Sequence, residues 1–115
     1  MNLISNQNYS ATHYEPSTGT FWRLSKAFNA YIPIQLHDRR VNVLQASTGR
    51  YTWKGAGNLA WEYITGSPLP KGFLIYFKNL DNEDFRAENL GIIRRSELRS
   101  LKAAMLNVKG GLGII

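Results

Sequence analysis

The chain has 115 residues, 43% hydrophobic and 19% charged, a composition typical of one soluble globular domain and not of a disordered chain. It has no cysteine, which excludes disulfides and thiolate metal sites and fits a reducing compartment. Because no apolar run reaches the roughly 18 residues of a membrane span and residues 1–6 lack signal-peptide character, we expect a cytoplasmic protein without a membrane partner.

The charge is +6 with a pI near 9.8, and it is unevenly distributed. Residues 1–80 carry +5, residues 81–90 carry −3 and residues 91–115 carry +4. A basic surface attracts polyanions and releases counterions when it contacts phosphates. Nucleic acid is therefore the first partner to expect, and a merely solvated basic face is the alternative.

The first half of the chain reads as an antiparallel sheet. Residues 1–8 are polar and expected to be loose. Ser-Thr-Gly turn signals at residues 17–19 and 47–49 each precede a short aromatic strand, as if one hairpin chemistry were used twice. Residues 31–36 and 41–44 alternate as strands do, and residues 37–40 make the turn that connects them.

The character of the chain changes after residues 55–57. Asn58 is placed to cap a short helix over residues 59–65, with Gly66 at its C-terminal end. Residues 73–77 form a continuous apolar run typical of a buried strand. Asp84 is expected to cap a helical turn over residues 85–90, after which residues 92–93 return to extended structure.

A longer helix is predicted from Ser96, as its N-cap, to Gly110-Gly111. Leu98, Leu101, Met105 and Val108 have helical spacing. Basic side chains follow one flank of this helix and either contact phosphates or are simply solvated: Arg95, Arg99, Lys102 and Lys109. The apolar tail, residues 112–115, is expected to pack on the core or on a partner.

The segment at residues 14–22 is followed by several short motifs in a fixed order. They are Leu59-Ala60-Trp61, the Pro-rich turn Gly66–Gly72, Asn79 with Asp81, and Arg86-Ala87-Glu88-Asn89-Leu90. In this order the chain resembles the HNH homing-endonuclease family, which is common in phage genomes. The resemblance implies an α+β fold in one compact domain. It has a β-rich part at residues 1–55, a degenerate ββα core at residues 56–93, and a basic helix with a tail at residues 94–115.

In that family a strand aspartate and a helix Asn or His hold a divalent cation on the scissile phosphate, and a histidine activates water. Counting back from Glu88-Asn89-Leu90 places Tyr76 at the aspartate and Phe77 at that histidine, and a further family histidine falls on Gly57. Only Asn89 matches the family site, and we expect it to bond backbone. The resemblance therefore implies an inactive nuclease fold with no catalytic residues, metal or cofactor.

Other candidates for chemistry are few. His37, beside Asp38, and His13 read as solvated residues. The acids Asp81, Glu83 and Asp84 could bind a hard cation, but they also suit a capping loop.

We expect nucleic-acid binding, to DNA in preference to RNA, as the function. The expected contacts come from Arg39, Arg40, Arg50, Lys54, Arg94, Arg95, Arg99 and Lys102, with Trp53. Trp22, Tyr51 and Trp53 would stack on bases if the target is single-stranded. Core packing is the alternative for these aromatics, and it is favoured for Trp61. Two other functions remain open: a protein-interaction module that binds a host or phage enzyme, and an active nuclease with a relocated site.

Overall fold

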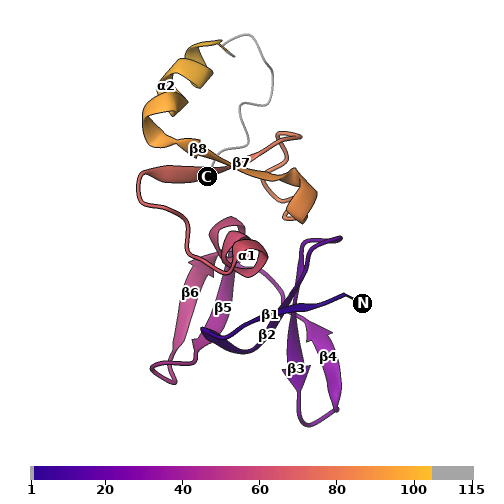
Figure 1. Ribbon diagram of the computed structural model, residues 1–115. Helices are drawn as coiled ribbons and strands as arrows, with labels where there is room; N and C mark the ends of the chain where they lie inside the picture. The colour runs from indigo at the N-terminus through magenta and orange to yellow at the C-terminus, as the bar shows by residue number, and fades with distance from the viewer. Residues whose placement is uncertain (1, 105–115) are drawn as a thin grey trace.

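The computed structural model describes residues 2–104 of the chain, and the expected α+β fold is confirmed (Figure 1). A six-stranded sheet comes first, and a helix, a two-stranded sheet and a second helix follow. The strands of the first sheet are β1 (Ile4–Asn6), β2 (Tyr9–Glu15), β3 (Thr20–Ser25), β4 (Ala30–Pro33), β5 (Arg40–Gln45) and β6 (Tyr51–Gly55). The later elements are α1 (Ala56–Thr65), β7 (Phe73–Phe77), the 3-10 turn η1 (Ala87–Asn89), β8 (Leu90–Arg94) and α2 (Arg95–Ala104).

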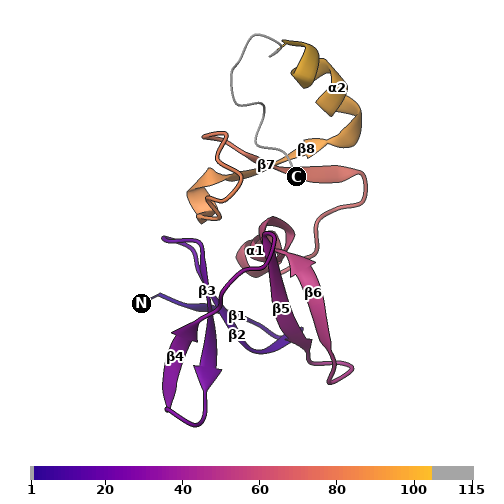
Figure 2. The ribbon, with the colours of Figure 1, turned by 180° about the vertical axis from the view of Figure 1, so that it is seen from behind.

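Strand β2 is the centre of the first sheet, whose antiparallel order is β4-β3-β2-β5-β6, with β1 also paired to β2. Tyr9 and Ser10 pair with β5, whereas residues 12–15 pair with β3. Between these two segments, Ala11 has a positive φ of 58°. This conformation interrupts the alternation of the strand, as a bulge does. Tyr9 and Thr12 are therefore both buried although they are three residues apart. Because β2 changes partner at this point, the β3–β4 and β5–β6 hairpins diverge from it (Figures 1 and 2).

The expectation that the start of the chain is loose is wrong for residues 4–6, which form β1. Ile4 pairs with Tyr14 and Ser5 with His13 across the β1–β2 ladder. Ile4 also packs against the core, so burial of one apolar side chain and a backbone ladder hold this segment.

A turn at residues 37–40 is confirmed, but the strands on either side of it do not pair with each other, because β4 pairs with β3 and β5 with β2 and β6. His37 and Arg40 exchange both backbone hydrogen bonds, at 3.0 and 2.9 Å. The two central residues, Asp38 and Arg39, have φ values of 51° and 58°. Positive φ at both central positions is the geometry of a two-residue hairpin turn.

Helix α1 is confirmed with a shifted start. It begins at Ala56 after Gly55, so Asn58 is an exposed residue of the first turn and not the cap. Gly66 ends the helix in the left-handed conformation, donating its N–H to Glu62 O. The buried face of α1 packs on the sheet in a core cluster with side chains of β2, β3 and β5: Leu59, Ala60, Tyr63, Tyr14, Phe21, Val41 and Val43.

Strands β7 and β8 pair in register from Phe73 opposite Arg94 to Phe77 opposite Leu90. The predicted buried strand is confirmed, since Ile75 and Phe77 are both buried. Helix α2 begins at Arg95, so Ser96 lies inside its first turn, and the predicted end at Gly110 lies outside the described residues. The order strand, strand, helix thus covers residues 73–104.

The segment between β7 and β8 attaches to the first sheet through backbone contacts. Tyr14 Oη donates to Phe85 O, and Ala87 N donates to Pro16 O at 2.9 Å. Gly19 lies so close that a Cβ there would be 2.5 Å from the Phe85 carbonyl carbon. Phe85 and Leu90 belong to the same core cluster as the side chains of the sheet. The two parts of the molecule therefore share one core.

Candidate nucleic-acid interface

Strand β7 carries the two positions that the resemblance assigns to catalysis. Phe77 has no exposed surface and meets Phe85 edge to face, with ring centroids 5.7 Å apart. Tyr76 lies opposite Gly91, and its ring covers that glycine so closely that a Cβ there would be 2.5 Å from a ring carbon. Both aromatic rings are thus packed against the protein itself.

Asn89 and Gly57, the other two positions that the resemblance assigns to the family site, are both buried. Asn89 is buried; its Oδ1 accepts from Asn79 N and its Nδ2 donates to Asp84 O, each at 2.9 Å. The prediction that Asn89 bonds backbone is therefore confirmed. Gly57 is buried in the first turn of α1.

The acidic loop, residues 81–84, is organised around one ion pair. Asp84 accepts from Arg86 at 2.8 and 2.7 Å and from Asn79 Nδ2 at 2.8 Å, and Arg86 also contacts Glu88. The Arg86 guanidinium lowers the pKa of Asp84 to about 2, and this carboxylate raises the pKa of Arg86. Asp84 does not cap η1, which starts after Arg86 without a side-chain cap. Within residues 2–104, no three His, Asp or Glu side chains are grouped to hold a metal ion.

The predicted basic contacts of the sheet fall into two kinds. Arg40 and Arg50 are exposed. Lys54 instead points toward α1, where its Nζ lies 3.5 Å from Glu62 Oε2 and 5.5 Å from the centre of the Tyr9 ring. Tyr9 Oη donates to the Glu62 carboxylate at 2.9 Å, and Tyr9 and Glu62 together raise the pKa of Lys54. Lys54 therefore helps to neutralise a buried glutamate.

Arg39 lies beside the acidic loop. It is half-buried and lines a hollow of about 510 Å³ with Asp38, Asn82 and Glu83. Its buried Nη1 has no hydrogen-bond partner among the described residues. The mixed charge of this hollow makes Arg39 a weaker phosphate contact than Arg40 or Arg50.

A second basic surface lies where β8 meets α2. Lys71, Arg94 and Arg95 surround a hollow of about 530 Å³ with Phe73 and Ser96. Arg94 stacks on the Phe73 ring at 5.6 Å. Lys71 was not predicted, because it lies more than twenty residues before Arg94 and only the β7–β8 pairing brings it there. The predicted contacts Arg99 and Lys102 follow on α2, and their side chains lie outside the described set.

The aromatic residues predicted to stack on bases differ in how exposed their side chains are. Tyr51 and Trp53 are 60% and 50% exposed and lie two residues apart on the same face of β6. Trp22 is half-buried and donates its Nε1–H to Glu15 at 3.3 Å. The core role expected for Trp61 is confirmed, since it packs against the core cluster.

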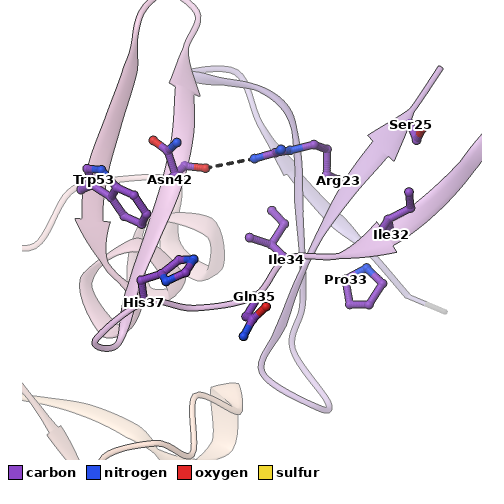
Figure 3. A pocket seen from close by; sticks show the side chains of 9 residues that line it. All are labelled: Arg23, Ser25, Ile32, Pro33, Ile34, Gln35, His37, Asn42 and Trp53. Atoms are coloured by element: carbon purple, nitrogen blue, oxygen red, sulfur yellow. Dashed lines mark hydrogen bonds between the residues drawn. The ribbon is translucent and has the colours of Figure 1, made fainter. Parts of the chain in front are cut away.

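A groove opens between the two diverging hairpins, on the face of β6 that carries Trp53 (Figure 3). Its volume is about 570 Å³. One wall comes from β3 and β4, the other from β5 and β6, and the linker after β4 crosses between them. The lining residues are Arg23, Ser25, Ile32, Pro33, Ile34, Gln35, His37, Asn42 and Trp53. Sequence reasoning missed this groove because its residues are spread over thirty positions.

Part of the chain is similar to a known protein family. Residues 54–99, from the end of β6 into α2, match the family model described as HNH endonuclease. No curated protein and no solved structure matches the chain. No helix within residues 2–104 has the length and apolarity to cross a membrane. Over residues 54–99 the chain is thus similar to the HNH endonuclease family, and this similarity points to a function related to nucleic acid.

Proposed function

We propose that this protein binds nucleic acid, DNA in preference to RNA, and does not hydrolyse it. The observation that carries the proposal is the pair Tyr76–Phe77 in β7. Under the resemblance these residues stand where the family keeps an aspartate and a histidine. Phe77 has no exposed surface and no atom that accepts a proton, so it cannot act as a general base.

The neighbouring positions do not fit a divalent cation either. Gly57 has no side chain, and both polar atoms of the Asn89 amide are used in hydrogen bonds to backbone. A hard cation needs several oxygen or imidazole donors, and these four positions offer only the Tyr76 phenol and an engaged amide. These four positions therefore do not support metal-dependent hydrolysis.

Two exposed basic surfaces support the binding part of the proposal. Arg40, at the start of β5, and Arg50, in the loop before β6, are both exposed. Lys71, Arg94 and Arg95 line the hollow at the start of α2. Three cations around one hollow favour a phosphate, because arginine and lysine both bind phosphate oxygens.

The binding test is a mobility-shift titration on duplex DNA across a salt series. About six phosphate contacts give a log–log slope near −5. The double variant Arg94→Gln/Arg95→Gln should make the slope less steep by about 2, since each lost contact removes about 0.9. Lys78→Gln, which removes an exposed charge next to the acidic loop, is the control and should keep the slope. An affinity that does not depend on salt would contradict the proposal.

The catalytic part is tested by plasmid nicking with Mg²⁺ or Mn²⁺. We expect no cleavage above the protein-free control. Metal-dependent cleavage that His37→Ala abolishes would overturn the proposal in favour of an active nuclease with a relocated site.

A second candidate function is supported by exposed apolar side chains on the β3–β4 hairpin: Leu24, Phe28, Tyr31 and Ile32. Phe28 is 77% exposed at the hairpin loop. Leu24 and Tyr31 lie opposite each other across the hairpin, and exposed apolar side chains that lie together are typical of protein-interaction sites. The test is a pull-down from nuclease-treated host lysate. A host enzyme retained by the wild type and lost with Phe28→Asp would favour a protein-interaction module.

A further inference from the structure

We propose that the groove between the β3–β4 and β5–β6 hairpins binds unpaired bases of a single-stranded nucleic acid, with Trp53 as the stacking platform and Arg23 as the phosphate contact. This inference rests on the proposed nucleic-acid function and names its substrate class. The groove is lined by residues of β3 to β6 and of the segment between β4 and β5, and none of them belongs to β7, so it is separate from the positions discussed for catalysis.

Trp53 is positioned to stack. It lies opposite Asn42 on β6 and is half exposed. His37 meets it perpendicularly, with ring centroids 5.6 Å apart, and this contact limits the rotamers of the indole. A ring held in place loses little entropy when a base stacks on it, and every base has a π-face to offer.

Arg23 supplies the charge of the groove. Its Nη2 donates to Asn42 O at 3.4 Å, so the guanidinium reaches from β3 toward β5 (Figure 3). No carboxylate is among the lining residues, and no ion pair of Arg23 is present in the described part of the chain. The guanidinium of Arg23 therefore has N–H groups that can still donate hydrogen bonds to a phosphate oxygen.

The surroundings favour a polyanion over an acidic or apolar peptide. Of the three acids in residues 1–80, Glu15 and Glu62 are buried, which leaves Asp38 exposed. Lys26, Arg40 and Arg50 are exposed on the same half of the molecule. A strand leaving the groove in either direction thus meets a positive field.

The same geometry selects single strands. The bases of a duplex are stacked on their neighbours and their faces are covered, so an indole inside a groove reaches only a base that is unstacked. The amides of Gln35 and Asn42 and the hydroxyl of Ser25 line the groove and can bond to base edges. Ile32, Pro33 and Ile34 form its apolar part.

The test measures binding of fluorescently labelled oligo(dT) and of a labelled duplex to the full chain. Trp53→Ala should weaken oligo(dT) binding by about 5- to 150-fold and leave duplex binding within about twofold. Tyr51→Ala is the matched control: Tyr51 is on the same face of the same strand and more exposed, but it does not line the groove. It should leave both affinities within about twofold.

Two further variants separate stacking from charge. Trp53→Phe keeps a stacking ring, so oligo(dT) affinity should stay within about threefold while the binding-induced quenching of tryptophan fluorescence is lost. Arg23→Gln should make the salt slope for oligo(dT) less steep by about 0.7, the value for one contact to a single strand. Trp53→Ala should leave that slope unchanged.

The outcomes separate this inference from the function on which it rests. Oligo(dT) binding that Trp53→Ala weakens and Tyr51→Ala does not weaken supports the groove. Duplex binding with no oligo(dT) binding, or oligo(dT) binding that Trp53→Ala leaves unchanged, overturns the inference and leaves the proposed function in place. Binding of neither overturns both. A lysate protein that the wild type binds and Trp53→Ala loses, without any oligo(dT) binding, assigns the groove to a peptide and overturns the inference.

Discussion

At position 77 the side chain faces the core, and its environment decides which residues the strand accepts. Phe77 is buried between β8 and Phe85. A histidine at this position would bury two ring nitrogens, and an unpaired buried polar group is costly. The packing that excludes water from this side chain therefore also opposes a histidine at this position.

We expect Phe77→His to lower the free energy of unfolding by about 2–4 kcal/mol, through lost packing and a buried polar ring. Phe77→Leu, which keeps an apolar side chain, should cost less than about 1.5 kcal/mol. Urea unfolding at neutral pH followed by circular dichroism measures both. Equal stability of the two variants would show that this position is not part of a tightly packed core.

Asp84 connects a single ionisation to the stability of the acidic loop. Its carboxylate accepts from Arg86 and Asn79, and the neighbouring guanidinium lowers its pKa from 3.8 to about 2. A carboxyl group with a lowered pKa in the folded state stabilises the fold only while it is ionised. Its contribution is therefore fully present above about pH 4 and is lost as the pH falls toward 2.

We expect the wild type to lose stability in this window and Asp84→Asn to lose less over the same range, because asparagine does not titrate. Arg86→Gln should also flatten the dependence, since without the guanidinium the pKa of Asp84 returns toward its usual value. The measurement is the urea midpoint at several pH values between 2 and 5. Identical pH profiles for the wild type and both variants would contradict the role of this pair.

At the scale of elements, the two Ser-Thr-Gly turns show how one local motif serves different purposes. Gly19 N donates to Glu15 O at 2.8 Å and Gly49 N to Gln45 O at 2.9 Å, and both glycines have positive φ, of 75° and 68°. The repeated hairpin chemistry that the sequence predicts is thus confirmed. Only Gly19 touches another element, since nothing lies within 4 Å of a Cβ at Gly49.

We expect Gly19→Ala to cost about 3 kcal/mol or more, because the left-handed backbone strains alanine and the new Cβ meets the Phe85 backbone, which cannot move without disturbing the core. Gly49→Ala has the strain without the clash and should cost about 1 kcal/mol. Chemical unfolding of the two variants gives both values. Equal costs would mean that the turn and the loop at Phe85 are not in contact.

For the whole molecule, the arrangement separates the basic surfaces. The hollow lined by Lys71, Arg94 and Arg95 lies at the α2 end, and the hairpins that form the groove lie at the other end (Figures 1 and 2). Residues 81–84 of the acidic loop line neither the hollow nor the groove. A nucleic acid that contacts both surfaces has to avoid this loop, because like charges repel within a Debye length.

Local patterns in the sequence were enough for much of this fold. The turn at residues 37–40, the helix that ends at Gly66 and the buried strand at residues 73–77 depend on local propensity and periodicity. The similarity to the HNH endonuclease family and the structural role of Asn89 could be predicted from short motifs in order. Helix starts were less accurate, because the cap depends on where the preceding strand ends, as at Gly55.

The face on which each side chain lies was decided by the tertiary structure. Alternation along β6 separates Tyr51 and Trp53 from Thr52 and Lys54, but the packing of α1 decides that Lys54 meets Glu62 and that Trp53 stays exposed. The groove exists because β2 changes partner at Ala11 and the hairpins diverge. Periodicity predicts which residues share a face. Which face is covered is determined by the packing between segments that are distant in the sequence.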